Sequence, residues 1–299
     1  MQNNFLISVI INSHNGEKFI ESSINSVLNQ SYQNFEIIFF DNASTDKTKI
    51  KVENFSNLYK KIKYYKVENK VKLYKARNLA IEKSSGELIS FLDVDDFWFK
   101  HKLRFQHELF KLNPKLGICY SNYIIYNYIK KTKKVVLKKF PKGFVFNDLI
   151  KNNFINMSTL MIRRDSLRHL DYIFNENYEI IGDYDLTLRL SRYVFTQGIS
   201  RPLSIYRWHG ENLSIKKRLN IIELLNWYNK NKKNKIVSQE KNINFMRNYI
   251  IYLIIRYYVS QYKKKRALIN LYKIKNFRLF CLSLFFIVCP QFIFKKITN

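Results

Sequence analysis

The residues best suited to chemistry in this chain are three carboxylates within four positions, Asp93, Asp95 and Asp96. They follow an apolar run over 88–92, which predicts a short buried strand broken only by Ser90. Carboxylates this close repel one another, and a divalent cation relieves that repulsion. Mg²⁺ and Mn²⁺ take oxygen ligands, commonly one or two carboxylates together with substrate phosphates. The alternative is a solvated acidic turn in which Trp98 covers the core, and the stretch alone leaves both interpretations open.

The elements before this stretch predict a sheet that gathers polar residues at one edge. Apolar runs over 5–11, 35–40 and 62–67 predict strands. Helical periodicity predicts three helices: one over 17–29, a second that follows the strand 35–40 and runs toward Phe55, and a third over 75–83. Ser44 or Thr45 is the expected cap of the second helix. This β-α alternation with short connections predicts a parallel, doubly wound α/β sheet, whose ligands bind outside the carboxyl ends of the strands. Besides the three acids, those ends carry Asn12, His14, Asp41 and Asn42.

The hydrophobic pattern over the rest of the first two thirds of the chain is less regular. Neither a Gly-rich dinucleotide fingerprint nor a P-loop follows any of the early strands, which disfavours a nicotinamide or flavin enzyme. The patterns predict a helix over 102–112, a long strand or strand pair over 116–128, a basic hairpin or loop over 130–142, a strand over 157–162, a helix opening at 181–185 and a short strand over 202–206.

The last third is strongly basic. The chain has 52 Lys and Arg against 23 Asp and Glu, and residues 215–299 hold 19 of the basic residues but only Glu223 and Glu240. A basic surface mixed with Tyr, Phe, Ile and Leu suits anionic lipid or nucleic acid. The apolar run Leu279–Phe294 has basic flanks, contains Pro290 and is short for a bilayer span, so it predicts an interfacial or re-entrant segment. The alternative is a helical pair packed on the sheet domain.

The cysteines and the N-terminus indicate the compartment. Cys119, Cys281 and Cys289 are odd in number and widely spaced, which favours reduced thiols in the cytoplasm. No basic region precedes the first apolar run, and Asn12 ends that run early, so we expect no signal peptide.

Four blocks of the sequence resemble family 2 inverting glycosyltransferases, which have the GT-A fold. In chain order they are SVIINSHNGEKFIESSINSVLNQSYQNFEIIFFDNASTDKT (8–48), RNLAIEKSSGELISFLDVDD (77–96), GDYDLTLRL (182–190) and YRWHGENLS (206–214). The resemblance covers about residues 5–214 and implies a Rossmann-like, mostly parallel doubly wound sheet. We therefore expect a nucleotide-sugar transferase domain over 1–214 and a basic, aromatic helical extension over 215–299.

The resemblance assigns roles to the polar strand ends. Asn12 and His14 fall in the loop that holds the nucleotide base, with His14 where the family commonly has Tyr. Asp41 and Asn42 match the pair that contacts the base. Further nucleotide-sugar contacts are implied for Arg77 near the phosphates, Asp93 on the ribose side, and Val94. The implied ligands of Mg²⁺ or Mn²⁺ are Asp95, Asp96 and His209, although His209 also fits a diphosphate contact or a structural role.

Asp183 matches the catalytic base of the family. In a single displacement the acceptor hydroxyl attacks the anomeric carbon opposite the leaving nucleoside diphosphate, and a base must accept its proton. The alternative for Asp183 is a helix N-cap or a first-turn acid stabilised by the helix dipole. Asp185 is the weaker candidate for the base.

The sequence therefore predicts a metal-dependent inverting glycosyltransferase. The expected donor is a nucleoside-diphosphate sugar of the UDP or dTDP type, and the expected acceptor is a glycan or a lipid-linked sugar. Processive relatives carry Q-x-x-R-W, whereas Ser204 stands where that Gln belongs before Arg207, so we expect single additions. We expect a cytoplasmic protein, peripheral on the anionic inner face of the cytoplasmic membrane. The competing interpretations are a basic nucleic-acid-binding protein, disfavoured because no binding motif is present, and a catalytically silent glycan-binding relative.

Overall fold

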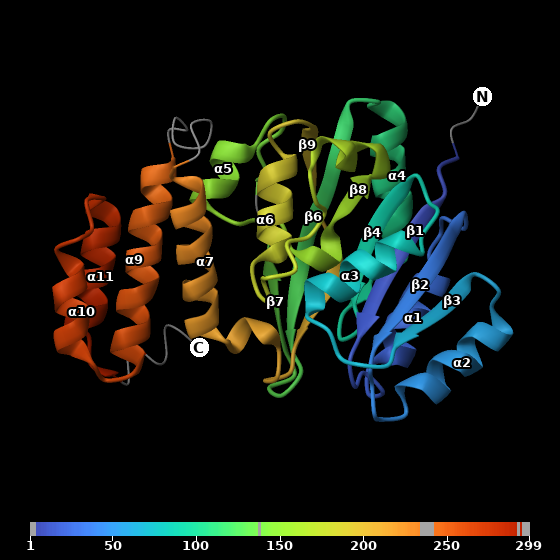
Figure 1. The fold of residues 1–299 in the computed structure, drawn as a ribbon, viewed down its shortest axis with the longest axis horizontal. Helices are drawn as coiled ribbons and strands as arrows, with labels where there is room; N and C mark the ends of the chain where they lie inside the picture. The colour runs from blue at the N-terminus through green and yellow to red at the C-terminus, as the bar shows by residue number, and fades with distance from the viewer. Residues whose placement is uncertain (1–3, 137–138, 234–241, 292–293, 295–299) are drawn as a thin grey trace. The chain divides into compact units, whose positions relative to one another are not determined.

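The computed structural model describes residues 4–136, 139–233, 242–291 and 294. The chain divides into two compact units: Met1–Phe146 with Phe154–Asn212, and Asn147–Asn153 with Leu213–Asn299. The segment 147–153, which the sequence placed in the first domain, belongs to the second unit. The elements are labelled in Figure 1.

The first unit begins with four parallel strands in the order β3-β2-β1-β4. All positions of β1 and β2 are buried, because helices cover a parallel sheet on its faces and leave its strands apolar throughout. The strands and their connecting helices are β1 (Ile7–Ser13), α1 (Ile20–Leu28), β2 (Phe35–Asn42), α2 (Thr48–Leu58), β3 (Ile62–Val67), α3 (Leu73–Glu82) and β4 (Leu88–Asp93).

The same sheet continues as β4-β8-β6-β9-β5, with β7 paired to β6, and has nine strands in all. β8 is antiparallel to both of its neighbours, whereas β6 and β9 run parallel to each other. The expected mostly parallel α/β sheet of the GT-A type is confirmed. The additional elements are β5 (Phe97–Trp98), α4 (Lys102–Leu112), β6 (Leu116–Asn127), β7 (Thr132–Val136), η1 (Met157–Thr159), β8 (Met161–Arg163), η2 (Arg164–His169), α6 (Gly182–Leu190) and β9 (Phe195–Trp208).

Three local predictions were wrong. Neither Ser44 nor Thr45 caps α2, because the Ser44 hydroxyl accepts the Asn15 N–H and the helix begins later. The strand predicted over 157–162 is a 3₁₀ turn followed by β8, since the Asn156 side chain accepts the Ser158 N–H and winds the chain there. The short strand expected over 202–206 lies in the second half of the longer β9, which starts at Phe195 and bulges against β6.

Other predictions were confirmed. The helix over 102–112 has the bounds of α4, and the run 116–128 forms one long strand, β6. The basic segment that follows forms a hairpin, because β7 pairs with the end of β6. Positions 137–138 of that segment lie outside the described residues.

The second unit is helical and has its own core. Ile255, Val259 and Ala267 are fully buried, and Leu271 and Phe286 pack with them. No described helix is long and apolar enough to cross a bilayer. The segment Leu279–Phe294 lies partly in α11, which ends two residues before Pro290, and positions 292–293 are outside the described residues. The helices are α5 (Phe146–Lys151), η3 (Leu213–Ile215), α7 (Lys217–Asn231), α9 (Ile243–Ser260), α10 (Lys264–Leu271) and α11 (Phe277–Val288).

Candidate active site

The carboxyl ends of β1, β2 and β4 meet at one edge of the sheet. Asn12 is paired in register with Asp93 on one side, and the next residue, Ser13, is paired with Asp41 on the other. Strand order and register therefore bring together polar residues that are separated by up to 81 positions in the chain. This edge is where ligands of such sheets bind.

Asp41 and Asn42 hold the loops at this edge. Asp41 is fully buried; its Oδ1 accepts the Ser44 N–H at 2.8 Å and its Oδ2 accepts the Tyr64 hydroxyl at 2.8 Å. The Asn42 amide makes two hydrogen bonds with the backbone of Val71, at 2.8 and 2.9 Å. Both side chains are thus already paired within the protein, and they fix the loop that follows β2 and the approach to α3.

Asn12 and His14 are placed differently. Asn12 is buried, and its Nδ2 has no hydrogen-bond partner among the described residues. A buried donor without an acceptor is costly, so it indicates a place where a ligand oxygen can bind. His14 is exposed and is held through Nδ1 to the Asn42 carbonyl at 2.9 Å, which leaves its ring open to solvent.

Arg77 crosses from α3 to the end of β4. Its buried guanidinium donates from Nη2 to Asp93 Oδ1 and lies 5.2 Å from the ring centre of Tyr74 and 6.0 Å from that of Phe174. Asp93 keeps about a third of its side chain exposed (36%), which leaves room for a ligand hydroxyl. The pair places one positive and one negative group at the strand edge.

Asp95 pairs with His209 from the loop after β9. Asp95 Oδ2 is 2.9 Å from His209 Nε2 and accepts a hydrogen bond from Asn212 Nδ2 at 3.2 Å. Asn212 also accepts the His209 N–H at 2.9 Å, so it fixes the position of the imidazole. Both members of the pair are partly exposed. A carboxylate oxygen and an imidazole nitrogen this close together can both bind Mg²⁺ or Mn²⁺ when substrate oxygens complete the coordination shell.

Asp96 turns inward instead of joining this pair. Its Oδ2 accepts the Ser158 hydroxyl at 2.5 Å and its Oδ1 accepts the Arg207 N–H at 2.9 Å. Burial raises the pKa of Asp96 well above its usual range, and the neighbouring carboxylates raise it further. Through these two hydrogen bonds Asp96 links the end of β4 to η1 and β9. Over the part of the chain that the structure describes, no group of three His, Cys, Asp or Glu side chains is placed to hold a metal ion, so the predicted trio with Asp96 is not formed.

Val94 and Ser90 have packing roles around the acids. Val94 lies against Gly16, where a Cβ would meet its methyl groups at 3.1 and 3.2 Å. Ser90, which breaks the apolar run of β4, accepts a hydrogen bond from the fully buried Lys102. Lys102 Nζ also lies 3.8 Å from the ring centre of Trp98, and burial lowers its pKa well below the usual range. These contacts fix the strand that carries the acids.

Asp183 lies in the first turn of α6 and is partly buried. Its Oδ1 accepts the Tyr184 N–H at 2.8 Å and the Tyr74 hydroxyl at 3.3 Å, whereas its Oδ2 has no hydrogen-bond partner among the described residues. Burial raises the pKa of Asp183, and the charge of Arg77 opposes that rise. A carboxylate with one oxygen fixed and the other unpaired can accept a proton. Asp185, in contrast, is buried and paired with Arg189 at 2.8 Å.

Three residues of this arrangement were not singled out from the sequence. The Tyr74 hydroxyl shares its one proton between Asp183 Oδ1 and the Ile180 carbonyl, which lies at 3.0 Å, so Tyr74 links α3 to the chain just before Asp183. Gly182 permits this approach, because a Cβ there would lie 2.5 Å from the Tyr74 ring. Asn212 is the Asn of the YRWHGENLS block, which was the available signal for it; Tyr74 had no local signal.

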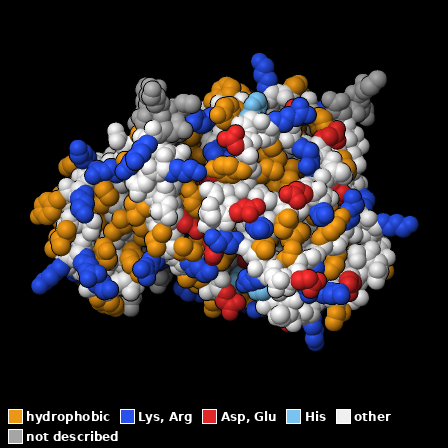
Figure 2. Space-filling view, in the orientation of Figure 1, with side chains coloured by type: hydrophobic (Ala, Val, Ile, Leu, Met, Phe, Trp, Pro, Cys, Tyr) orange, Lys and Arg blue, Asp and Glu red, His pale blue; other side chains and the backbone are white. Residues whose placement is uncertain are grey.

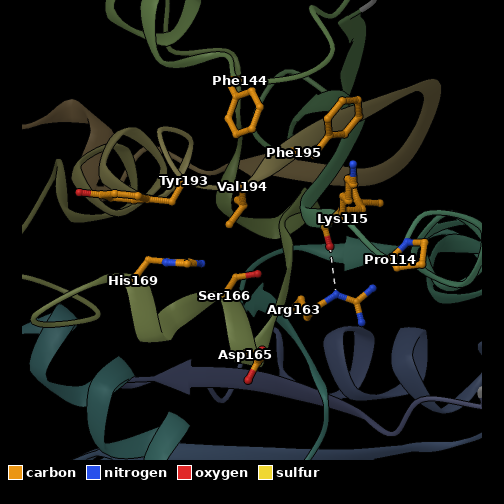
Figure 3. A pocket seen from close by; sticks show the side chains of 11 residues that line it. Pro114, Lys115, Phe144, Arg163, Asp165, Ser166, His169, Tyr193, Val194 and Phe195 are labelled. Atoms are coloured by element: carbon orange, nitrogen blue, oxygen red, sulfur yellow. Dashed lines mark hydrogen bonds between the residues drawn. The ribbon is translucent and has the colours of Figure 1, made fainter.

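One pocket of the first unit lies away from this edge of the sheet. It has a volume of about 580 Å³ and lies at the amino ends of β6 and β9, and it contains none of the predicted site residues. Figure 3 shows its wall, where the rings of His169 and Tyr193 stack with centres 5.5 Å apart. The strand-end site is therefore defined by the chemistry of its residues and by the strand register, and this pocket is separate from it.

Known proteins resemble this chain over much of its length. The profile described as Glycosyl transferase family 2 matches residues 8–171. An Escherichia coli protein named "UDP-Glc:alpha-D-GlcNAc-diphosphoundecaprenol beta-1,3-glucosyltransferase WfgD" is 36% identical over 170 residues, which are 57% of this chain and 65% of that protein. The "Putative teichuronic acid biosynthesis glycosyltransferase TuaG" of Bacillus subtilis is 30% identical over 71% of this chain and 82% of its own length.

Solved structures share the fold at lower identity. S. aureus TarS 1–349 in complex with UDP-GlcNAc superposes with a TM-score of 0.59 at 21% identity, covering 74% of this chain and 66% of that one. The mannosyltransferase PcManGT from Pyrobaculum calidifontis, in complex with GDP-Man and Mn²⁺, has a TM-score of 0.61 at 14% identity over 93% of this chain and 78% of its own. At these identities the likeness concerns the fold.

Proposed function

Since this chain belongs to glycosyl transferase family 2 and is a glycosyltransferase, we propose that it transfers one sugar, with inversion, from a nucleoside-diphosphate sugar to a lipid-linked or glycan acceptor. The observation that carries this proposal is the line of contacts from Asp93 through Arg77 and Tyr74 to Asp183. It joins residues suited to a nucleotide sugar to a carboxylate that can accept a proton.

The donor is proposed to lie across the strand ends. The unpaired Nδ2 of Asn12 and the open ring of His14 suit the base, while Asp93 suits a ribose hydroxyl and Arg77 the phosphates. Asp41 and Asn42 would act by shaping the base loop, since their polar atoms are already paired. UDP is the favoured nucleotide because WfgD is named for UDP-Glc and TarS was solved with UDP-GlcNAc, and dTDP is the alternative.

Asp183 is proposed as the base of the displacement. The acceptor hydroxyl attacks the anomeric carbon, the bond to the nucleoside diphosphate breaks, and the hydroxyl proton passes to Asp183. Tyr74 and the Tyr184 N–H hold Oδ1, so that Oδ2 remains to take the proton. The raised pKa of Asp183 makes its carboxylate a stronger base than an exposed aspartate.

Asp95 and His209 are proposed to hold Mg²⁺ or Mn²⁺ together with oxygens of the donor diphosphate. A bound divalent ion neutralises the negative charge that grows on the leaving diphosphate. Asn212 orients both ligands through its amide. The PcManGT structure contains Mn²⁺, which agrees with this choice of ion.

The second unit is proposed to hold the enzyme on an anionic membrane surface, peripheral on the cytoplasmic face. Residues 241–299 contain no Asp or Glu, and α11 exposes Phe277 (82%), Phe285 (47%) and Val288 (66%). Figure 2 shows Lys and Arg side chains next to hydrophobic ones over α9 to α11. A helix with an apolar face among basic residues binds at the headgroup level of anionic bilayers. The same surface would bring the enzyme to a lipid-linked acceptor.

The test of the proposed reaction is a donor screen. The enzyme is incubated with UDP-sugars and dTDP-sugars, Mg²⁺ or Mn²⁺ and a synthetic lipid-diphosphate sugar acceptor, and release of nucleoside diphosphate and the glycosylated product are both measured. We expect product with one donor, with the anomeric configuration opposite to that of the donor. Product of retained configuration, or no transfer with any donor, would refute the proposal.

A further inference from the structure

Two lysines and an arginine converge on one tyrosine ring beside the candidate metal pair. Lys18 stands just before α1, Tyr128 just after β6, Lys131 in the turn before β7, and Arg207 near the end of β9. Lys18 Nζ lies 4.8 Å and Lys131 Nζ 4.0 Å from the Tyr128 ring centre, and Arg207 Cζ lies 5.9 Å from it. We refer to Lys18, Tyr128, Lys131 and Arg207 as the cationic cluster.

The cationic cluster adjoins the Asp95–His209 pair through Phe19. The Phe19 ring centre is 5.8 Å from that of Tyr128 and 5.1 Å from that of His209. Arg207 also lies over Phe19, at 4.6 Å. One aromatic ring therefore separates the cluster from the point at which the proposed metal would bind.

The charges of this cluster are only partly offset. Arg207 is buried, donates from Nη2 to the Ser22 hydroxyl at 3.0 Å, and feels the nearby carboxylates of Asp95 and Asp96. Lys18 and Lys131 are exposed, and neither forms an ion pair within the described ranges. Cation–π contacts hold both ammonium groups within 4.8 Å of the Tyr128 ring centre, although like charges on one ring repel each other. An anion that contacts both ammonium groups would relieve that repulsion.

We propose that Lys18 and Lys131 bind the diphosphate of a lipid-diphosphate acceptor, an inference that rests on the proposed function. Such a reaction has two diphosphates, one in the donor and one in the acceptor. The site contains two cationic groups to match: Arg77, linked to Asp93 and through Tyr74 to Asp183, and the cationic cluster, which reaches the site through Phe19 and His209. No described contact joins Arg77 to the cluster.

The Tyr128 ring lowers the entropy cost of binding an anion at the cationic cluster. Lysine side chains lose considerable rotamer freedom when they bind a phosphate, which weakens binding by free surface lysines. Here the ring holds both ammonium groups in advance, so part of that entropy is already lost before the ligand arrives. A diphosphate offers enough oxygens to contact both groups at once.

The test measures binding with the donor subsite filled. Farnesyl diphosphate is titrated into the full chain with saturating UDP and Mg²⁺, with farnesol as the uncharged probe and UDP affinity measured separately. In the double variant Lys18→Gln/Lys131→Gln we expect the Kd of farnesyl diphosphate to rise about tenfold, the size of two modest charge contacts. Farnesol and UDP affinities should stay unchanged. The control is Lys60→Gln/Lys115→Gln, which removes the same charge at two exposed lysines outside the cluster.

The outcomes separate the possible sources of the anion. A loss of UDP affinity with farnesyl diphosphate binding intact would assign the lysines to the donor and overturn the proposal. An equal loss in the control pair, or wild-type protein that does not bind farnesyl diphosphate, would also overturn it. If the expected pattern appears but no sugar is ever transferred to a lipid-diphosphate acceptor, the inference about the cluster stands and the proposed function fails.

Discussion

Gly182 is the residue whose replacement most sharply tests how Asp183 is positioned. An alanine Cβ at position 182 would lie 2.5 Å from Cδ2 and Cε2 of Tyr74. Carbon atoms in contact settle near 3.5 Å, so the ring and the start of α6 must separate by about 1 Å. The Tyr74 hydroxyl is the side-chain donor to Asp183, so this movement shifts the carboxylate as well. A misplacement of about 1 Å can cost about 10²-fold in rate.

The assay for Gly182→Ala is kcat for transfer, measured together with UDP affinity and Tm. We expect kcat to fall about 10²-fold and UDP affinity to stay within about twofold, because the donor contacts do not involve Gly182. Overpacking should also lower the free energy of unfolding by about 1–3 kcal/mol. The matched control is Gly198→Ala, whose Cβ would lie 2.3 Å from the Phe140 ring, in a part of the sheet that has no contact with Asp183.

The two variants separate positioning from general damage. Tm should decrease by a similar amount in both variants, but kcat should decrease only in Gly182→Ala. If Gly182→Ala keeps wild-type kcat, or if Gly198→Ala loses as much, the inference that Tyr74 and Gly182 position the base is refuted.

Three further predictions follow from the site and the second unit. A hydrogen bond donated to a carboxylate favours its charged form, so Tyr74→Phe should raise the Asp183 pKa further and move the acid limb of the kcat–pH profile to higher pH. Activity should still be lost as pH falls through that pKa, because the base must be ionised. Asp95→Ala should abolish the response of transfer to added Mg²⁺ or Mn²⁺, measured as nucleoside-diphosphate release. Phe277→Ser/Phe285→Ser should weaken binding to anionic lipid vesicles more than about tenfold in flotation, since two exposed apolar side chains no longer enter the bilayer.

Each of these predictions has a result that contradicts it. An acid limb that stays in place or moves to lower pH in Tyr74→Phe would mean that the kcat–pH profile does not report Asp183. If transfer by Asp95→Ala still responds fully to added Mg²⁺ or Mn²⁺, Asp95 is not a metal ligand. For the vesicle assay the control is Leu58→Ser/Leu112→Ser, which removes two exposed apolar side chains of the first unit (76% and 77% exposed). Equal losses of vesicle binding in the two double variants would contradict the proposal that α11 forms a specific membrane-binding face.

The early strands could be predicted because their signal is local. β1, β2 and β4 are short apolar runs with polar residues at their ends, and a parallel sheet places those ends at one edge. The neighbouring positions of Asn12 and Asp93 could therefore be predicted, whereas Asp183 was singled out through the family resemblance and its role stays a prediction. β9 was predicted too short because its first half, which contains Gly198, lacks strand character and gains it only by pairing with β6.

The different roles of the acids could not be predicted, because they depend on distant partners. Asp95 and Asp96 are adjacent and chemically identical in the sequence. Asp96 is turned inward by Ser158 and the Arg207 N–H, which lie 62 and 111 positions away, while Asp95 faces His209. Tyr74 was missed for the same reason, since its hydroxyl meets Asp183 across 109 positions.

The most direct test of the central claim is single-turnover transfer by Asp183→Asn. Asparagine keeps an oxygen for the Tyr74 and Tyr184 donors but cannot accept the acceptor's proton at neutral pH. Because burial raises the pKa of Asp183, its charge is disfavoured in the folded state, and the neutral amide should cost no Tm. We predict donor affinity within about twofold of wild type and a transfer rate lower by about 10²–10⁴-fold, the usual contribution of a general base. Transfer near the wild-type rate would contradict the account.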